Sequence, residues 1–210
     1  MVALRPLSCA DIPVIKGWPS YPTEFAMLDY CHKDGGWLDT YGKDEKNAVF
    51  VAADGGEIVG FSLLLEEKSA SPEFMVALRP DRLGTGLGRT VAQLTLAAGF
   101  SRPEVTHIRL IVRKNNFRAQ ALYASLGFAR TGEMTKEVQG VPVDFFCMEI
   151  SRGEFYRKER MKETVPVGDS GDLPVQPSDT GRPRLHKAVA DYENPDDAWK
   201  EHAKKRLVQD

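Results

Sequence analysis

The sequence predicts an α/β fold, called α+β in some schemes, built on one mixed sheet, and three observations support this class. An apolar strand at residues 74–78 leads through a glycine-rich turn into an apolar helical pattern that continues to residue 100. A strand at residues 107–112 follows that helix, so the unit is a βαβ crossover with parallel or nearly parallel strands. Two further pairs of strands are joined by short glycine turns, which predicts antiparallel hairpins.

Length and composition limit the class of protein. The 210 residues allow one core of about 150 residues with an appendage. The chain is 42% hydrophobic and 28% charged, with a formal charge of −2, so we expect a soluble protein for which nucleic acid is an unlikely partner. The three cysteines, Cys9, Cys31 and Cys147, are far apart and lack the spacing of metal ligands, so we expect no metal. Reduced thiols in a cytoplasmic protein are the simplest interpretation. No apolar run approaches the ~20 residues that span a membrane.

The first third of the chain predicts one strand, one short helix and an aromatic region. Residues 2–5 form a strand that Pro6 stops, and Ser8 or Asp11 caps a helix that ends at Gly17. The aromatic region that follows carries Trp18, Tyr21, Phe25, Tyr30, Trp37 and Tyr41. For each of these rings, closing the core over the sheet edge is one interpretation and lining a binding site is the other.

Strands and helices alternate through the middle of the chain. Residues 48–53 and 58–65 are strands joined by the hairpin turn Asp54-Gly55-Gly56-Glu57. The helix after the glycine-rich turn begins near Gly88 and ends at residues 101–103. Its expected core-facing stripe is Val91, Leu94, Thr95, Ala98 and Phe100.

The last elements predict a boundary near residue 151. Asn115 or Asn116 caps a helix that Gly127 stops, and residues 133–138 and 143–150 form a final hairpin around Gln139-Gly140. We therefore divide the chain into a domain at residues 1–151 and an extension at residues 152–210. In the extension we expect a charged helix at 154–163, a linker at 165–183 and a short helix after it. One hypothesis is that the extension docks on its own domain or on a partner chain through Tyr192 and Trp199, and the alternative is a disordered tail.

The turn after the strand at 74–78 is the main functional signal. Gly84, Gly86 and Gly88 let the backbone fold tightly and let an anion approach its amides, and the following helix adds unpaired N–H groups. The turn predicts a phosphate site. A Walker loop is excluded by spacing, and a dinucleotide fingerprint is excluded because Arg89 occupies its sixth position.

Two stretches together resemble the GNAT superfamily of acyl-CoA-dependent N-acyltransferases. Leu83, Gly86 and Gly88 fall at the defined positions of its pyrophosphate loop, usually Arg/Gln-x-x-Gly-x-Gly/Ala, and Leu78-Arg79-Pro80 matches the preceding Val-x-Pro-like step. Leu83 departs from the usual Arg or Gln, and Arg82 or Arg89 is expected to supply the charge. The second signature is Asn116-x-x-Ala119-x-x-Leu122-Tyr123 with Gly127-Phe128.

The resemblance implies a mostly antiparallel sheet of six to seven strands, with a splayed parallel pair and about four helices. It also implies transfer of an acetyl group from acetyl-CoA to a primary amine, by direct attack in a ternary complex. The residues expected to bind the cosubstrate are Leu78, Arg79, Leu83, Gly84, Thr85, Gly86, Leu87, Gly88, Arg89, Thr90, Asn116 and Tyr123.

Three catalytic roles follow from the same resemblance. A backbone N–H at Leu78, or at its neighbour Ala77, is expected to bind the thioester oxygen where a bulge splays the strands. Tyr123 is expected to protonate the leaving thiolate, although a purely structural core tyrosine is the alternative. Glu73 is the candidate general base, with a solvated strand-start glutamate as the alternative. His32 stays possible as a base, and His107 is more readily structural.

The acceptor and the assembly stay open. A catalytically inactive module that binds CoA or a protein partner is the alternative to an enzyme. The acceptor amine belongs to a metabolite, a protein or an aminoacyl-tRNA, and a homodimer is also considered. The acidic residues Asp29, Asp34, Asp39 and Asp44 suit a cationic amine, but scattered surface charge explains them equally well.

Overall fold

The fold is built on one seven-stranded sheet. The computed structural model describes residues 1–66 and 71–163. The strand order is β1-β2-β3-β4-β5-β7-β6, and every neighbouring pair is antiparallel except β4 and β5, which are parallel. The strands are β1 Val2–Pro6, β2 Ala48–Asp54, β3 Glu57–Leu65, β4 Glu73–Leu78, β5 His107–Arg113, β6 Ala129–Val138 and β7 Val141–Ser151. The mixed sheet, the parallel pair and both hairpins are confirmed.

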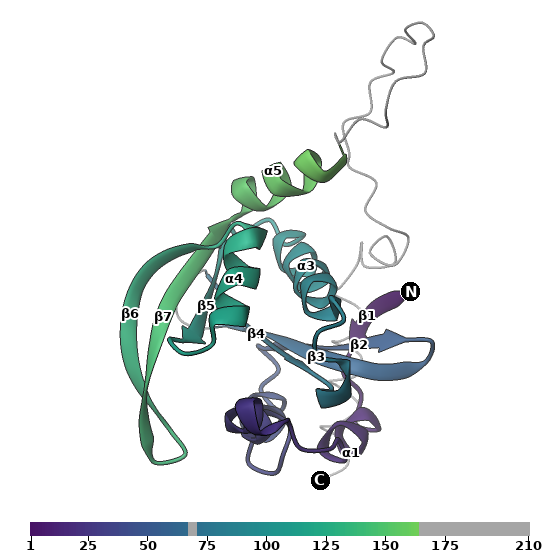
Figure 1. Cartoon of the computed structure of the whole chain (residues 1–210). Helices are drawn as coiled ribbons and strands as arrows, with labels where there is room; N and C mark the ends of the chain where they lie inside the picture. Colours follow the sequence, from purple (N-terminus) through teal and green to yellow (C-terminus); the bar gives the residue numbers. More distant parts are fainter. Residues whose placement is uncertain (67–70, 164–210) are drawn as a thin grey trace, which may run out of the picture.

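Helices cover both faces of this sheet (Figure 1). On one face lie α3 (Leu87–Phe100) and α4 (Phe117–Leu126), with α5 (Arg152–Glu163) beyond them. On the other lie α1 (Asp11–Lys16), the 3₁₀ helix η1 (Thr23–Cys31) and α2 (Trp37–Tyr41). A short 3₁₀ turn, η2 (Pro80–Arg82), links β4 to the glycine-rich turn. None of the helices in the described ranges is long and apolar enough to cross a membrane.

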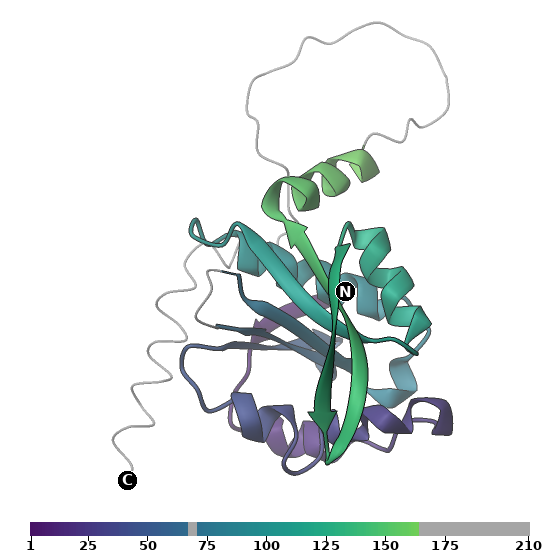
Figure 2. The same cartoon turned by 90° about the vertical axis from the view of Figure 1, so that its left-hand side faces the viewer.

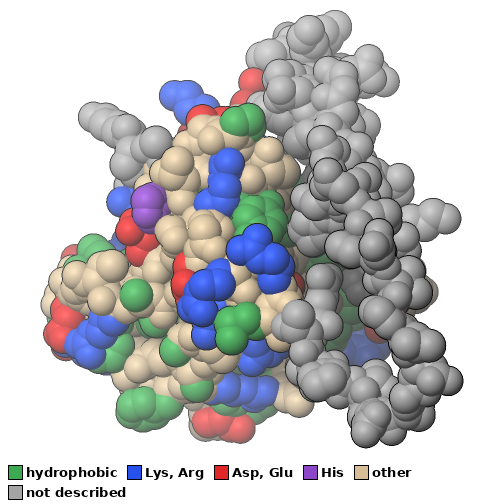
Figure 3. All heavy atoms as spheres, turned by 90° about the horizontal axis from the view of Figure 1, so that it is seen from above, with side chains coloured by type: hydrophobic (Ala, Val, Ile, Leu, Met, Phe, Trp, Pro, Cys, Tyr) green, Lys and Arg blue, Asp and Glu red, His purple; other side chains and the backbone are tan. Residues whose placement is uncertain are grey.

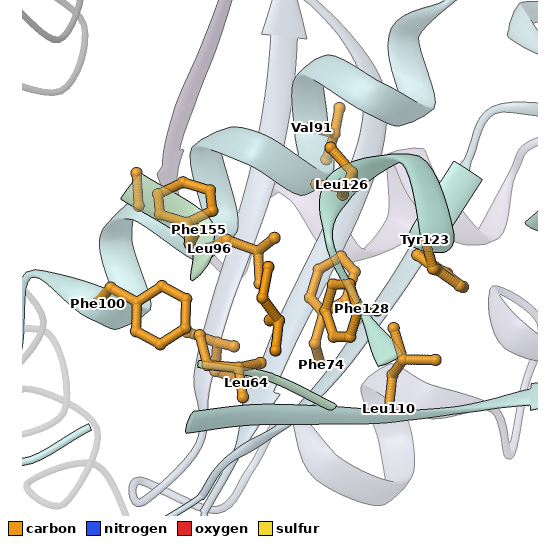
Figure 4. Packing of buried hydrophobic residues seen from close by; sticks show 14 of the residues in the cluster. Leu64, Phe74, Val91, Leu96, Phe100, Leu110, Tyr123, Leu126, Phe128 and Phe155 are labelled. Carbon is orange, nitrogen blue, oxygen red and sulfur yellow. The ribbon is translucent and has the colours of Figure 1, made fainter. Parts of the chain in front are cut away.

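Two hydrophobic cores result, one on each face of the sheet. The core under α3 and α4 contains Leu64, Phe74, Leu96, Phe100, Ile108, Leu110, Leu126 and Phe128 (Figure 4). The core under η1 and α2 contains Ile15, Trp18, Cys31, Leu38, Val51, Phe61, Leu63 and Ala77. Because successive strand residues point to opposite faces, Phe74 enters the first core and Ala77 enters the second.

The parallel strands β4 and β5 separate almost as soon as they meet. Their register contains one pair, Glu73 with Arg109, and the amide of Arg109 donates to the carbonyl oxygen of Pro72 at 3.1 Å. The rest of β4 pairs with β3 alone, without a register shift. The splayed pair is therefore confirmed, but the bulge expected in β4 is absent from its pairing with β3.

Three expectations about individual elements are corrected. Leu94 and Ala98 of α3 are only partly buried, whereas Ala92 and Leu96 are fully buried, because α3 packs over several strands and its buried arc is wider than one stripe. Strand β6 begins at Ala129 rather than residue 133, and curves with β7 across the end of the sheet (Figure 2). Neither Ser8 nor Asp11 caps α1, because the N-cap is Ala10 and no side chain makes the cap hydrogen bond. The amide and hydroxyl of Ser8 instead donate to the Asp11 carboxylate.

Helix α5, which the sequence analysis assigns to the extension after residue 151, packs against the rest of the fold. Phe155 is 1% exposed, and its ring lies 5.4 Å from the ring of Phe100 on α3. Arg152 donates to the carbonyl oxygens of residues 102, 103 and 105. Figure 3 looks down on this end of the molecule, where Lys and Arg side chains spread over the surface. The expected linker, Tyr192 and Trp199 lie outside the described residues.

Candidate active site

The glycine-rich turn presents a run of main-chain amides. Gly84 and Gly86 both have φ of +85°, a left-handed conformation that glycine adopts at little cost. In the described chain, the amides of residues 84–88 donate no hydrogen bond, whereas Leu83 and Arg89 donate to the carbonyl oxygens of Pro80 and Gly86. A methyl group at Gly86 would meet no atom within 4 Å. The open amides and the start of α3 form a site for an anion.

The cationic side chains around this turn differ in how far they are already engaged. Arg79 pairs with Asp81 and Glu57, and Arg82 pairs with Glu57. Within the described part of the chain, Arg89 donates only to a neutral hydroxyl, that of Ser125, at 2.8 Å. These pairings leave Arg89 the better of the two expected substitutes for the charge that Leu83 lacks.

Arg118 on α4 adds a fourth cation to the surroundings of the turn. A methyl group built at Gly84 would lie 3.4 Å from Nη2 of Arg118. Arg118 is exposed and has no ion pair among residues 1–66 and 71–163. Sequence reasoning missed this residue, because its position depends on how α4 packs beside α3. The signal in the chain was its place in the first turn of the helix that Asn116 caps.

The other residues expected at the turn lie around it. Thr85 donates through its hydroxyl to the carbonyl oxygen of Arg82 at 2.8 Å. Leu83 and Leu87 are partly buried, and Thr90 is exposed on the first turn of α3. Gly88 lies where a methyl group would be 3.5 Å from Leu78 and from Leu122. The turn therefore packs directly against the end of β4 and against α4.

The end of β4 has backbone groups aimed at the gap between β4 and β5. The amide of Arg79 donates to the carbonyl oxygen of Val59 at 2.9 Å, so Arg79 and Ala77 form the hydrogen-bonded pairs with β3. The backbone groups of Val76 and Leu78 consequently point toward β5, which has already separated. Of the two positions considered for the thioester oxygen, this orientation favours Leu78 over Ala77 and adds Val76 as a second donor.

Tyr123 lies on α4 at the edge of the core (Figure 4). Its ring packs edge-on against Phe74 and Phe128, with centroid distances of 6.2 and 5.7 Å. Burial raises the pKa of the Tyr123 phenol well above its usual range, so the group stays protonated at neutral pH. The hydroxyl makes no hydrogen bond within the described residues. A protonated donor without a partner can give its proton to a leaving group.

The fold does not gather the candidate general bases at the end of β4 beside Tyr123. Glu73 begins β4, and five residues at ~3.3 Å each put it about 16 Å along the strand from Leu78. His32 is 1% exposed between the rings of Trp18 and Tyr21, and desolvation lowers its pKa. His107 begins β5 and contacts Thr106. These positions do not favour Glu73 or His32 as the group that deprotonates the amine.

A cleft runs between η1 and the start of α4. Asn116 caps α4, since its Oδ1 accepts from the amide of Ala119 at 3.1 Å, and Asn115 does not. The cleft has a volume of about 270 Å³ and is lined by Glu24, Phe25, Met27, Leu28, Asn115, Asn116, Phe117 and Arg118. Arg118 thus connects this cleft to the glycine turn. In the part of the chain that the structure describes, no cluster of His, Cys, Asp or Glu could hold a metal ion.

Comparisons with known proteins identify the family of this chain. The model of the acetyltransferase (GNAT) family matches residues 15–128, which include the turn, the gap and Tyr123. The chain belongs to this family. Spermidine N(1)-acetyltransferase of Escherichia coli K12 is 30% identical over 149 residues, covering 65% of this chain and 77% of that protein.

Solved structures share the fold. Spermidine N-acetyltransferase from Vibrio cholerae, in complex with CoA and spermine, superposes with a TM-score of 0.61 at 22% identity, covering 74% of this chain and 98% of that one. A dodecameric structure of spermidine N-acetyltransferase from the same organism gives 0.57 at 22% identity, covering 73% and 95%.

This GNAT chain is an acetyltransferase that transfers an acetyl group from acetyl-CoA to an amine. Its own residues suit that cosubstrate. The turn offers amides and cations to a diphosphate, and the gap offers backbone donors beside it.

Proposed function

We propose that the amine attacks acetyl-CoA directly, in a complex that holds both substrates. The observation that carries this proposal is the run of five amides at residues 84–88 beside the opening between β4 and β5. These amides and Arg118 bind the diphosphate of CoA, with Arg89 nearby. The thioester then lies along the free edge of β4, within reach of Leu78 and Tyr123.

Each reacting atom has a protein group suited to it. The amine nitrogen forms a bond to the carbonyl carbon, and negative charge develops on the carbonyl oxygen, where the Leu78 N–H stabilises it. When the carbon–sulfur bond breaks, the Tyr123 hydroxyl gives its proton to the sulfur. The attacking amine loses a proton to solvent, and the Tyr123 phenolate takes up a proton from solvent. The products are the amide and CoA with a free thiol.

For the acceptor, we propose a primary aliphatic amine, with spermidine first to be tested. The curated relatives at 30% identity are named for spermidine. The cleft supports an aliphatic cation, because the Glu24 carboxylate lies there beside the apolar side chains of Phe25, Met27 and Leu28. A panel of spermidine, spermine, an aminoglycoside and a peptide with a free N-terminus, followed by thiol release, separates these classes.

Calorimetry with CoA tests the phosphate site. Gly86→Glu places a carboxylate among the open amides and should abolish micromolar binding. Gly140→Glu is the matched control, because Gly140 also has positive φ (+77°) and open space but lies in the β6–β7 turn. Equal loss in both variants would point to a general effect of the substitution, and unchanged binding in Gly86→Glu would refute the site.

We also propose that the chain forms a homo-oligomer. Strand β6 is one of the two outer strands of the described sheet, and one structural neighbour is described as dodecameric. Light scattering coupled to gel filtration gives the mass directly. A mass of 23.4 kDa at micromolar concentration would contradict the proposal.

A further inference from the structure

The end of β4 is held by Tyr21, which lies in the segment between α1 and η1. The hydroxyl of Tyr21 donates to the carbonyl oxygen of Leu78 at 2.5 Å, across 57 positions of sequence. This carbonyl points toward β5, where a parallel strand would otherwise supply the donor. Tyr21 therefore takes the place of β5 at the point where the two strands have separated.

Tyr21 is itself fixed at three points. It is 5% exposed, and its ring packs edge-on against His32 at 5.5 Å. Its amide donates to Oδ1 of Asp29 at 2.7 Å, and its hydroxyl binds Leu78. Burial raises the pKa of the Tyr21 phenol, so the hydroxyl keeps the proton that it donates.

The peptide group that follows Leu78 is consequently held from both sides. Its oxygen accepts from Tyr21, and its N–H, which belongs to Arg79, donates to the carbonyl oxygen of Val59 at 2.9 Å. The side chain of Leu78 meets the start of α3 near Gly88. A buried carbonyl without a donor costs free energy, so the hydrogen bond from Tyr21 favours the open arrangement of the two strands.

We propose that Tyr21 is a positioning residue for acetyl transfer, which orients the end of β4 so that the free Leu78 N–H meets the thioester carbonyl. The inference rests on the proposed function of that N–H and extends it, because it assigns a contribution to catalysis to a residue of the aromatic region that precedes η1. Tyr21 acts through Leu78 and need not touch the reacting atoms.

The substitution Tyr21→Phe keeps the ring and removes only the hydroxyl. We expect kcat at saturating substrates to fall about tenfold, while KM for acetyl-CoA and the melting temperature change little. Tyr156→Phe is the matched control, since Tyr156 is a partly buried tyrosine on α5, and should leave kcat unchanged. A kcat within twofold of wild type in Tyr21→Phe would overturn the proposal.

Infrared spectroscopy of bound acetyl-CoA, labelled with ¹³C at its carbonyl, provides a readout independent of turnover. A hydrogen bond from Leu78 lowers the carbonyl stretching frequency in wild type, and we expect Tyr21→Phe to reverse most of that shift. An identical frequency in both proteins, or no shift in wild type, would overturn the inference. Wild type that binds acetyl-CoA with the shift but acetylates no amine would instead count against the proposed reaction.

Discussion

At the scale of single residues, the phenol of Tyr123 is the group on which the proposed chemistry depends most. Its ring is packed between Phe74 and Phe128, and burial keeps the hydroxyl protonated. Tyr123→Phe preserves this packing and removes the proton donor. We expect kcat to fall by about 10²-fold, as is typical for loss of a general acid, while the Kd for CoA from calorimetry changes less than twofold.

Two outcomes would contradict this role. A Tyr123→Phe enzyme with kcat within threefold of wild type would show that the leaving thiolate needs no acid from this position. A variant that loses CoA binding and activity in parallel would make Tyr123 a packing residue.

Asp11 makes a separate prediction about stability and pH. Arg5 and Ser8 hold the pKa of the Asp11 carboxyl at about 2, against an ordinary value of 3.8. Because the folded value is the lower one, the ionised carboxylate stabilises the fold above pH 4, and this contribution disappears as the pH falls through 2. The difference amounts to about 2 kcal/mol.

Urea unfolding of Asp11→Asn at several pH values measures this contribution. We expect the variant to be about 2 kcal/mol less stable than wild type at pH 6, and the two proteins to become similar near pH 2. A difference in unfolding free energy that stays constant between pH 6 and pH 2 would exclude a pKa effect.

At the scale of elements, α5 contributes to the core and not only to the surface. Phe155 is fully buried against Phe100. Phe155→Ala should lower the free energy of unfolding by about 3–5 kcal/mol, through lost burial and a cavity. Met161→Ala on the same helix should change it by less than about 0.5 kcal/mol, because Met161 is 58% exposed. Equal effects of the two substitutions would mean that α5 does not pack as described.

The elements show which structural signals are local. The hairpin turns, the cap of α4 and the Gly127 stop are set by residues within a few positions of one another. The turns and the stop are confirmed, and of the two predicted caps, Asn115 and Asn116, the structure shows Asn116. Packing between distant segments has no such signal. The apolar residues of α5 are sparse, so nothing in residues 152–163 indicated that Phe155 enters a core formed by α3.

At the scale of the whole molecule, the proposed site lies where three distant segments meet the open edge of β4. Residues 84–88 supply amides, α4 supplies Tyr123 and Arg118, and the segment before η1 supplies Tyr21. The two motifs predict the turn and Tyr123 as parts of this site from the sequence. The hydrogen bond of Tyr21 to Leu78, the proximity of Arg118 to Gly84 and the distance of Glu73 from Leu78 depend on how the layers assemble, so the sequence could not predict them.

The central claim is that the amides of residues 84–88 bind the diphosphate of CoA. Nuclear magnetic resonance of ¹⁵N-labelled protein tests it most directly, by comparing the amide signals with CoA and with pantetheine, which lacks the diphosphate. The account predicts that CoA shifts the signals of Gly84, Thr85, Gly86, Leu87 and Gly88 more than those of other amides, and that pantetheine leaves them unchanged. Saturation with CoA without a shift in these five signals would contradict it.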